Sequence, residues 1–487
     1  MTQSSNSNLQ KRYIFHSLPL LQFFLMPDRK KIFRYSSLLI LAAVLIWVIH
    51  YAWISFPIIS GFGAKQMCSC MFVSGRTKES IDTSELADFP FTLGTYKPDM
   101  KDSSVTGSIW GMAKKKAIYR KGIGCTLIND ITEKELRSQT FAIPSPPVNT
   151  DSAPFPYGDK VDTIPAGINK EKLNADVDLA FREPFPDKKV RTRAVVVVYE
   201  GQLIAERYAP GFDKNTMMFG WSMAKSFTAA LIGILVNKGK LNITKPAPVQ
   251  EWSDINDPRH AITIKHLLQQ TSGLDFQEDY TKASSVTNML FKKGDMAAYI
   301  ATQDLAHEPG TIFNYSSGNS NILSRIIRQT VGEKDYAAFP CTELFYKIGM
   351  YHTLLEPDAS GTYVGSSYIM ATARDFARFG LLYYNDGVWN SERILPEGWV
   401  KETATAPAAN ALKNYGYQFW LNGVNKNDTS KRIFPDVPAD MFYCDGYGFQ
   451  DIYIIPSKKL VVVRLGLTLD KSFDENAFLK NIIDAIE

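Results

Sequence analysis

Ser222 and Lys225 are the residues of this chain whose types and spacing best suit covalent catalysis. They stand three positions apart at the start of an apolar, helix-forming run, so the lysine amine can reach the serine hydroxyl on one helix face. A serine becomes a strong nucleophile when a neighbouring base takes its proton, and a lysine can be that base if burial lowers its pKa. The pair therefore predicts acyl transfer through Ser222.

The apolar pattern around this pair predicts the elements that must position it. Two β-rich runs, 193–199 and 202–208, are separated by Glu200-Gly201, which is typical of a hairpin. A second strand pair, 449–455 and 460–466, stands near the C-terminus. Helical patterns are expected at residues 222–238, 371–386 and 474–486. Strands at both ends with helices between them predict an α+β domain whose sheet joins its N- and C-terminal segments.

The order of a strand pair and then an S-x-x-K helix resembles the serine β-lactamase and penicillin-binding protein superfamily. Three later segments resemble further motifs of this family, namely 262–274 (ITIKHLLQQTSGL), 309–318 (PGTIFNYSSG) and 371–399 (ATARDFARFG to EGW). The resemblance covers about residues 189–466, and several ordered motifs are more specific than one. It implies a β-lactamase/transpeptidase-like fold, with a central antiparallel sheet flanked by helices and a helical subdomain.

The same resemblance implies a third catalytic residue, Tyr315, which would relay a proton between Ser222, Lys225 and the leaving group. The family usually has asparagine two positions later, where this chain has Ser317. Hydrolases of 6-aminohexanoate oligomers resemble the Tyr-Ser-Ser arrangement better, and in them a tyrosine that matches Tyr280 closes over the substrate. Substrate contacts are therefore expected at Tyr280, Ser317 and Trp221.

The third motif of the family departs from its usual pattern in this chain. The segment reads Cys444-Asp445-Gly446-Tyr447, without the lysine or histidine that the family places on the strand lining the site. A cationic clamp for a substrate carboxylate is not supported by these residues. The backbone N–H groups of Ser222 and Tyr447 can still form an oxyanion hole, because that role needs no particular side chain.

A long apolar segment near the N-terminus predicts a membrane anchor. Residues 35–59 contain no Asp, Glu, Lys or Arg, and they are long enough to span a bilayer as a helix. Basic residues gather before the segment, at Lys11, Arg12, Arg29, Lys30, Lys31 and Arg34. This bias predicts a cytosolic N-terminus and a catalytic domain on the exported, periplasmic or extracellular side.

The expected organisation is a cytosolic segment (1–34), a transmembrane anchor (35–59), a membrane-proximal extension with some β structure (60–149), a Pro-rich linker or wrap (150–188) and the hydrolase domain (189–487). Five cysteines are scattered along the chain without a CxxC pair. In an oxidising compartment either Cys68 or Cys70 could bond Cys125, and free buried thiols are the alternative.

Other chemistries find little support in the sequence. There is no G-x-S-x-G motif for an α/β-hydrolase, and the six histidines form no H-E-x-x-H, so neither a metal nor an organic cofactor is expected. His266 is expected to pack on its helix. A net charge of +4 spread along 487 residues does not predict a nucleic-acid partner.

The sequence therefore predicts a membrane-anchored serine hydrolase, an amidase or esterase that cleaves small linear amides or esters as 6-aminohexanoate-dimer hydrolases do. A cell-wall D,D-peptidase or β-lactamase is the alternative within the enzyme class. A membrane-tethered binding or sensing domain without turnover is the alternative outside it.

Overall fold

The computed structural model describes residues 29–147, 152–161, 165, 167–470 and 472–486. The chain forms two compact units, Met1–Ala52 and Trp53–Glu487. Most of the predicted cytosolic segment, 1–34, lies outside the described residues. The predicted Pro-rich linker is described only in part.

Helix α1 (Arg29–Phe72) contains the predicted apolar span and extends beyond both of its ends. Within the described part of the chain, it is the one helix long and apolar enough to cross a membrane, judged by length and composition. In the first unit its side chains are exposed up to Tyr51. In the second unit the helix is buried almost continuously from Ile59 to Cys70, so this part is packed as core.

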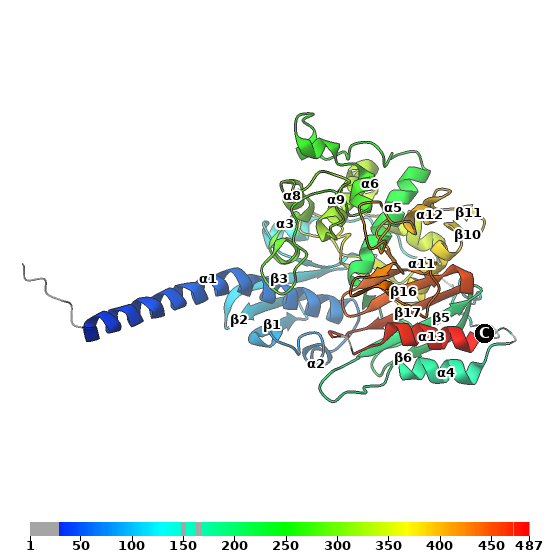
Figure 1. The fold of residues 1–487 in the computed structure, drawn as a ribbon, viewed down its shortest axis with the longest axis horizontal. Helices are drawn as coiled ribbons and strands as arrows, with labels where there is room; N and C mark the ends of the chain where they lie inside the picture. Colours follow the sequence, from blue (N-terminus) through cyan, green and yellow to red (C-terminus); the bar gives the residue numbers. More distant parts are fainter. Residues whose placement is uncertain (1–28, 148–151, 162–164, 166, 471, 487) are drawn as a thin grey trace, which may run out of the picture. The chain divides into compact units, whose positions relative to one another are not determined.

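A four-stranded antiparallel sheet packs on this buried part of α1 (Figure 1). Its strands are β1 (Gly94–Asp99), β2 (Ser104–Ile109), β3 (Met112–Arg120) and β4 (Gly124–Leu127). The sheet approaches α1 closely, because a Cβ at Gly107 would lie 2.4 Å from the Ser60 carbonyl oxygen. A disulfide joins Cys68 of α1 to Cys125 of β4, and Cys70 is a buried free thiol. Of the two cysteines that the sequence left open, Cys68 therefore forms the bond.

The central sheet has six strands in the order β12-β15-β16-β17-β5-β6, with antiparallel neighbours. The strands are β5 (Thr192–Tyr199), β6 (Gln202–Tyr208), β12 (Trp420–Leu421), β15 (Phe442–Gly446), β16 (Gln450–Ile455) and β17 (Leu460–Gly466). Pairing of β17 with β5 confirms the prediction that N- and C-terminal segments share one sheet.

Both faces of the central sheet are covered, which explains the unbroken apolar run in β5. Val195 and Val197 pack in a core with α4 (Lys170–Leu179) and α13 (Glu475–Ile486), whereas Val196 and Val198 face the core that includes α11 (Ala373–Tyr384). A strand buried on both faces needs no polar alternation.

Helices on the α11 side form the predicted helical part of the fold. They are α5 (Ala224–Asn237), α6 (Ile264–Leu268), α7 (Ser285–Lys292), α8 (Met296–Ala301), α9 (Ser317–Val331) and α10 (Glu333–Tyr336). The remaining short helices are α2 (Lys78–Asp82), α3 (Glu133–Ser138) and α12 (Trp399–Thr403). Short strands complete the fold: β7 (Met218–Phe219), β8 (Thr353–Leu355), β9 (Ile369–Ala371), β10 (Val388–Trp389), β11 (Glu392–Arg393), β13 (Val424–Asn425) and β14 (Asp428–Arg432).

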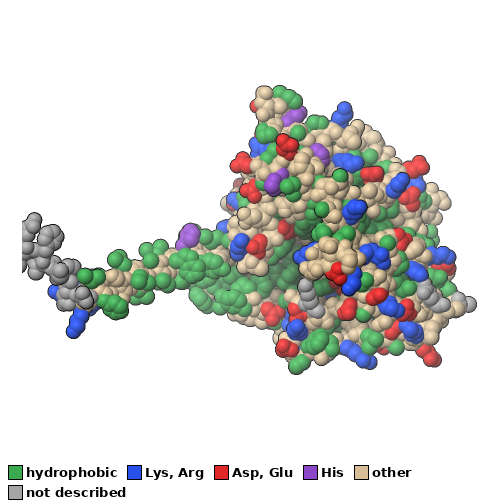
Figure 2. All heavy atoms as spheres, in the orientation of Figure 1, with side chains coloured by type: hydrophobic (Ala, Val, Ile, Leu, Met, Phe, Trp, Pro, Cys, Tyr) green, Lys and Arg blue, Asp and Glu red, His purple; other side chains and the backbone are tan. Residues whose placement is uncertain are grey.

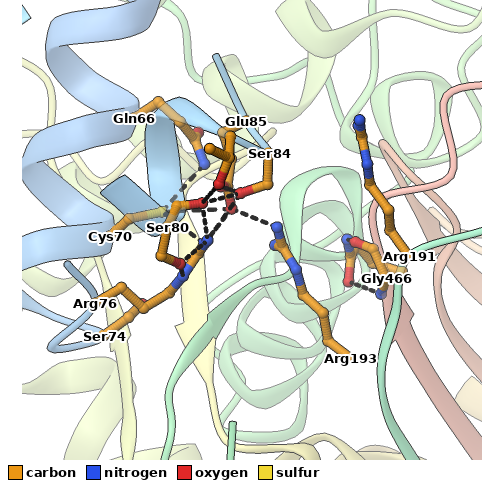
Figure 3. A network of polar contacts seen from close by, with 12 residues as sticks. Gln66, Cys70, Ser74, Arg76, Ser80, Ser84, Glu85, Arg191, Arg193 and Gly466 are labelled. Carbon is orange, nitrogen blue, oxygen red and sulfur yellow. Dashed lines mark hydrogen bonds and ion pairs between the residues drawn. The ribbon is translucent and has the colours of Figure 1, made fainter. Parts of the chain in front are cut away.

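Buried ion pairs tie the membrane-proximal residues to the rest of the second unit. Figure 3 shows Glu85 between Arg76 and Arg193, and an Arg193 guanidinium nitrogen lies 2.7 Å from the Glu85 carboxylate. Burial alone would raise the pKa of Glu85, but the charges of Arg193 and Arg76 outweigh it and lower the pKa to about 2. Within α1, the buried Lys65 pairs with Glu356.

Replacing the central carboxylate of this cluster should destabilise the fold. Glu85→Gln leaves two buried guanidinium groups beside each other without their shared anion, so we expect the free energy of unfolding to fall by about 3–5 kcal/mol. Because its pKa is depressed, Glu85 contributes stability above about pH 4.5 that is lost as the pH falls towards 2, and the variant should lack this dependence.

Denaturant unfolding of the full chain at pH 7 and pH 3.5 measures both effects. Asp82→Asn is the matched control, since Asp82 pairs with Lys78 at the surface and should contribute less than about 1 kcal/mol. Equal, small losses in the two variants would contradict a structural role for the Glu85 cluster.

Candidate active site

The predicted nucleophile lies on a sharp turn between a short strand and a buried helix. β7 ends at Phe219, residues Trp221–Met223 form a 3-10 turn, and α5 begins at Ala224, so the predicted helix at 222–238 starts with this tighter turn. Trp221 has a φ of +48°, which is uncommon for a bulky side chain. A backbone strained in this way is stable only when its surroundings hold it, and such residues cluster at functional sites.

Lys225 forms the contact that its spacing predicts. Its Nζ lies 3.0 Å from Ser222 Oγ, 3.1 Å from Ser317 Oγ and 2.9 Å from the Ser366 carbonyl oxygen. The side chain is 1% exposed. Burial lowers the pKa of Lys225 to about 8, although the carboxylates of Glu278 and Asp445 oppose the shift. A neutral amine is therefore accessible near physiological pH, as a general base requires.

Tyr315 lies beside the same two groups. Its phenol is close enough to Ser222 for that hydroxyl to act on its pKa, and Lys225 Nζ lies 4.8 Å from the centre of its ring. Burial raises the pKa of the Tyr315 phenol well above its usual value, helped by Tyr415 and Glu278, while the Ser222 hydroxyl opposes the rise. The ring also stacks on Trp420 at 5.2 Å between centroids. The Tyr315 phenol is therefore held neutral beside Ser222 and Lys225, and its role as a proton donor stays a prediction.

Ser317 is completely buried and bridges Lys225 to an acid that the sequence did not single out. Its hydroxyl donates to Glu278 at 2.6 Å, and its backbone N–H donates to the same carboxylate at 2.8 Å. The Tyr280 hydroxyl also donates to Glu278, at 2.8 Å. Glu278 lies two residues before Tyr280, but no local motif marks it, because its contact with the Lys225 site runs through Ser317, 39 residues away.

The other predicted residues surround this group. Tyr280 is 50% exposed, so its ring is open to the solvent side of the site. Trp221 is buried among aromatic rings, and its centroid lies 5.6 Å from that of Tyr447. The end of β15 approaches the turn before Ser222, since a Cβ at Gly446 would lie 2.1 Å from the Gly220 carbonyl oxygen. Tyr447 is thus beside Ser222, where an oxyanion hole made by their N–H groups stays a prediction.

Residues of the motif at 262–274 hydrogen-bond to the start of α9 and are not among the groups placed around Ser222 and Lys225 above. Gln270 Oε1 accepts from the backbone N–H of Ser316, the N-cap of α9, and from the Asn319 amide at 2.8 Å. Ser272 donates to Asn319 at 2.8 Å. His266 accepts from the N-cap of α6 through its ring, as expected of a histidine that packs on its own helix. Among the described residues, no group of three His, Cys, Asp or Glu could hold a metal ion.

The sheet with helices on both faces, together with the Ser222–Lys225 pair at the start of a buried helix, defines a serine hydrolase of the β-lactamase and penicillin-binding protein class. A family model described as Beta-lactamase matches residues 177–481, more than half of the chain. The chain therefore belongs to the beta-lactamase family.

Relatives of this chain include a 6-aminohexanoate-dimer hydrolase from Paenarthrobacter ureafaciens, which is 24% identical over 318 residues. The match covers 59% of this chain and 76% of that enzyme. Protein flp of Staphylococcus aureus (strain MRSA252) is 35% identical over 136 residues, and this chain spans about a quarter of its length, 26%.

Solved structures share the fold. A putative 6-aminohexanoate-dimer hydrolase from Bacillus anthracis is 23% identical with a TM-score of 0.51, and the match covers 71% of this chain and 87% of that one. A family VIII carboxylesterase is 14% identical with a TM-score of 0.51, with coverage of 67% and 99%. At such low sequence identities these similarities show a shared fold.

Removing the charge of Glu278 should change the pH at which Lys225 becomes active. The Glu278 carboxylate favours protonated Lys225, so Glu278→Gln should lower the pKa of Lys225. The acidic limb of the profile of kcat/KM against pH, expected near 8 in the wild type, should then move to lower pH. Measuring hydrolysis of p-nitrophenyl acetate from pH 5 to pH 10 tests this shift.

Glu392→Gln serves as the control, because that carboxylate pairs with Lys347 at the surface. Its pH profile should match that of the wild type. A limb that stays in place in Glu278→Gln, or moves to higher pH, would show that Glu278 does not act on Lys225.

Proposed function

We propose that this protein hydrolyses small linear amides or esters through an acyl-enzyme on Ser222. The observation that carries the proposal is the hydrogen bond between Lys225 Nζ and Ser222 Oγ, at 3.0 Å, with the Tyr315 ring 4.8 Å from the same Nζ. Neutral Lys225 takes the proton of Ser222 as its oxygen attacks the carbonyl carbon. Tyr315 passes a proton to the departing amine or alcohol, and water then releases the acid with the help of the same groups.

The oxyanion of the tetrahedral intermediate would be bound by the backbone N–H groups of Ser222 and Tyr447. These groups come from the turn that opens α5 and from the end of β15, which are in close contact. Donors held in place in this way stabilise charge that develops only as the reaction proceeds. No metal or organic cofactor is needed for any of these steps.

The substrate class follows from the charges around Lys225. At the third motif Asp445 stands close enough to act on Lys225, and burial raises the pKa of Asp445 to about 6. A carboxylate close to the cleaved bond, as D,D-peptidase and β-lactam substrates carry, would find no cation from this strand, which disfavours those substrates. The relative named 6-aminohexanoate-dimer hydrolase supports a linear amide, and an exposed Tyr280 could close over such a chain.

Residues 35–59 are proposed to anchor the enzyme in a membrane, with the catalytic part on the exported side. Support comes from the exposed apolar part of α1 and the basic residues before it. The Cys68–Cys125 disulfide agrees with this, since such bonds persist in oxidising compartments. Because the helix continues into buried core, residues from Ile59 onward belong to the folded enzyme.

Ser222→Ala should abolish both labelling and turnover. An activated-serine probe should add its mass to the wild type and leave the variant unlabelled, and hydrolysis of 6-aminohexanoate dimer and p-nitrophenyl acetate should fall at least about 10³-fold. Intact-mass spectrometry and rate measurements test both. Labelling of wild type without turnover would favour a sensing domain, and no labelling at all would refute the nucleophile. A membrane-impermeant form of the probe should label intact cells if the site is exported.

In Tyr315→Phe the aromatic ring remains but the proton donor is lost. Labelling by the activated-serine probe should therefore become slow but stay detectable, and kcat should fall by about 10²–10⁴-fold. Steady-state kinetics on the amide and on the ester measure the loss, which should be larger for the amide with its poorer leaving group. The control is Tyr417→Phe, whose hydroxyl contacts Glu402 away from Ser222. Equal kinetics in the two variants would remove Tyr315 from the mechanism.

A further inference from the structure

The hairpin between β2 and β3 has an unusual residue at its tip. Ile109 pairs with Met112, so the turn consists of Trp110 and Gly111 alone. Both have positive φ values, +50° and +79°, as in the two-residue turns that favour Asn-Gly. A bulky side chain in this left-handed region costs about 1–2 kcal/mol. The turn itself therefore does not explain why tryptophan stands at position 110.

Packing explains only a small part of Trp110. Its ring meets Phe56 of α1 edge-on, at 5.5 Å between centroids, yet 67% of the side chain remains exposed. Met112 is 52% exposed, and Trp53 on α1 is 81% exposed. Three large apolar side chains of the second unit are thus left to solvent around the same hairpin and helix. Figure 2 shows hydrophobic side chains gathered on the part of this unit that carries β1 to β3.

The chain connects this surface directly to the proposed membrane span. Trp53 and Phe56 lie in the last two turns of the apolar segment 35–59, and four helical residues rise about 6 Å along the axis. The hairpin is fixed to the same stretch, because Ser60 Oγ donates to the Ala113 carbonyl oxygen at 2.5 Å. An exposed lysine, Lys114, follows the hairpin tip. Tryptophan and basic side chains are both enriched where proteins contact lipid headgroups.

We propose that Trp110, Met112 and Trp53 form an interfacial anchor that enters the headgroup layer of the bilayer crossed by α1. The inference rests on the proposed membrane anchoring and extends it, since the hairpin would add a second attachment point beside the helix. A helix alone leaves a domain free to pivot, whereas two attachments fix its height and tilt. Burying the exposed apolar area in the interface also compensates for the strained turn.

The part of α1 that lies in the second unit also contacts the turn that carries Ser222. Phe62 lies six residues after Phe56 on α1, about 9 Å along the helix. Its ring stacks at 6.1 Å on Trp221, the residue before Ser222. The turn that carries Ser222 therefore packs on the same buried stretch of α1 that begins at the proposed interface.

Bromine quenching of tryptophan fluorescence tests the anchor with the full chain in phosphatidylcholine vesicles. In a Trp53→Phe background, Trp47 and Trp110 are the two tryptophans with more than half of the side chain exposed. Lipids brominated deep in the acyl chain should quench Trp47. Lipids brominated near the headgroup should quench Trp110, and adding Trp110→Asn should remove most of this shallow quenching. Asn suits the turn, so the thermal midpoint should stay equal or rise.

The outcomes separate the two proposals. If lipids brominated deep in the acyl chain do not quench the tryptophan fluorescence, and Trp47→Phe leaves the quenching unchanged, the proposal that α1 spans the membrane is wrong. If deep quenching is present but shallow quenching is the same with and without Trp110, the interfacial anchor is overturned and a protein partner or water covers the hairpin. Trp110→Gly, which also tolerates positive φ, repeats the test should the asparagine variant fold poorly.

Discussion

Burial of the Lys225 amine is the constraint on which the rest of the site depends. A lysine in water is protonated at neutral pH and cannot take a proton from serine. Here the side chain is almost fully enclosed, which lowers its pKa to about 8, and its hydrogen bonds go to Ser222, Ser317 and the Ser366 carbonyl. These partners come from three separate segments, so α5, α9 and the chain before β9 must meet at one point. The fold brings these three segments together around the amine.

Glu278 limits how far that burial can act. A desolvated lysine without a nearby anion would have a still lower pKa, and the neutral amine would then be a weaker base towards the Ser222 hydroxyl. By holding Ser317 through both its hydroxyl and its N–H, Glu278 fixes the start of α9 and keeps a negative charge near the amine. The Glu278 carboxylate thus affects both the position of Ser317 and the pKa of Lys225.

The sequence was most informative where chemistry follows from local spacing. Ser222 and Lys225 meet because they are three residues apart, and the β5–β6 hairpin forms around Glu200-Gly201 as the pattern indicates. Glu278 could not be found in this way, because its partner Ser317 is 39 residues away and loops decide the contact. The two-residue turn at Trp110 was also hidden, since tryptophan is not a residue that normally marks such a turn.

The membrane-proximal residues are better understood as part of the catalytic unit than as a spacer. α1 brings Lys65 to Glu356, Cys68 to Cys125 and Phe62 to Trp221. Arg76, just after α1, shares Glu85 with Arg193 of strand β5. A flexible tether would need none of these contacts. Because the buried half of α1 helps to hold Trp221, the strained residue before Ser222, removing this half of the helix would disturb the candidate site. The buried half of α1 therefore belongs to the same compact unit as Ser222, although its sequence continues directly from the apolar segment.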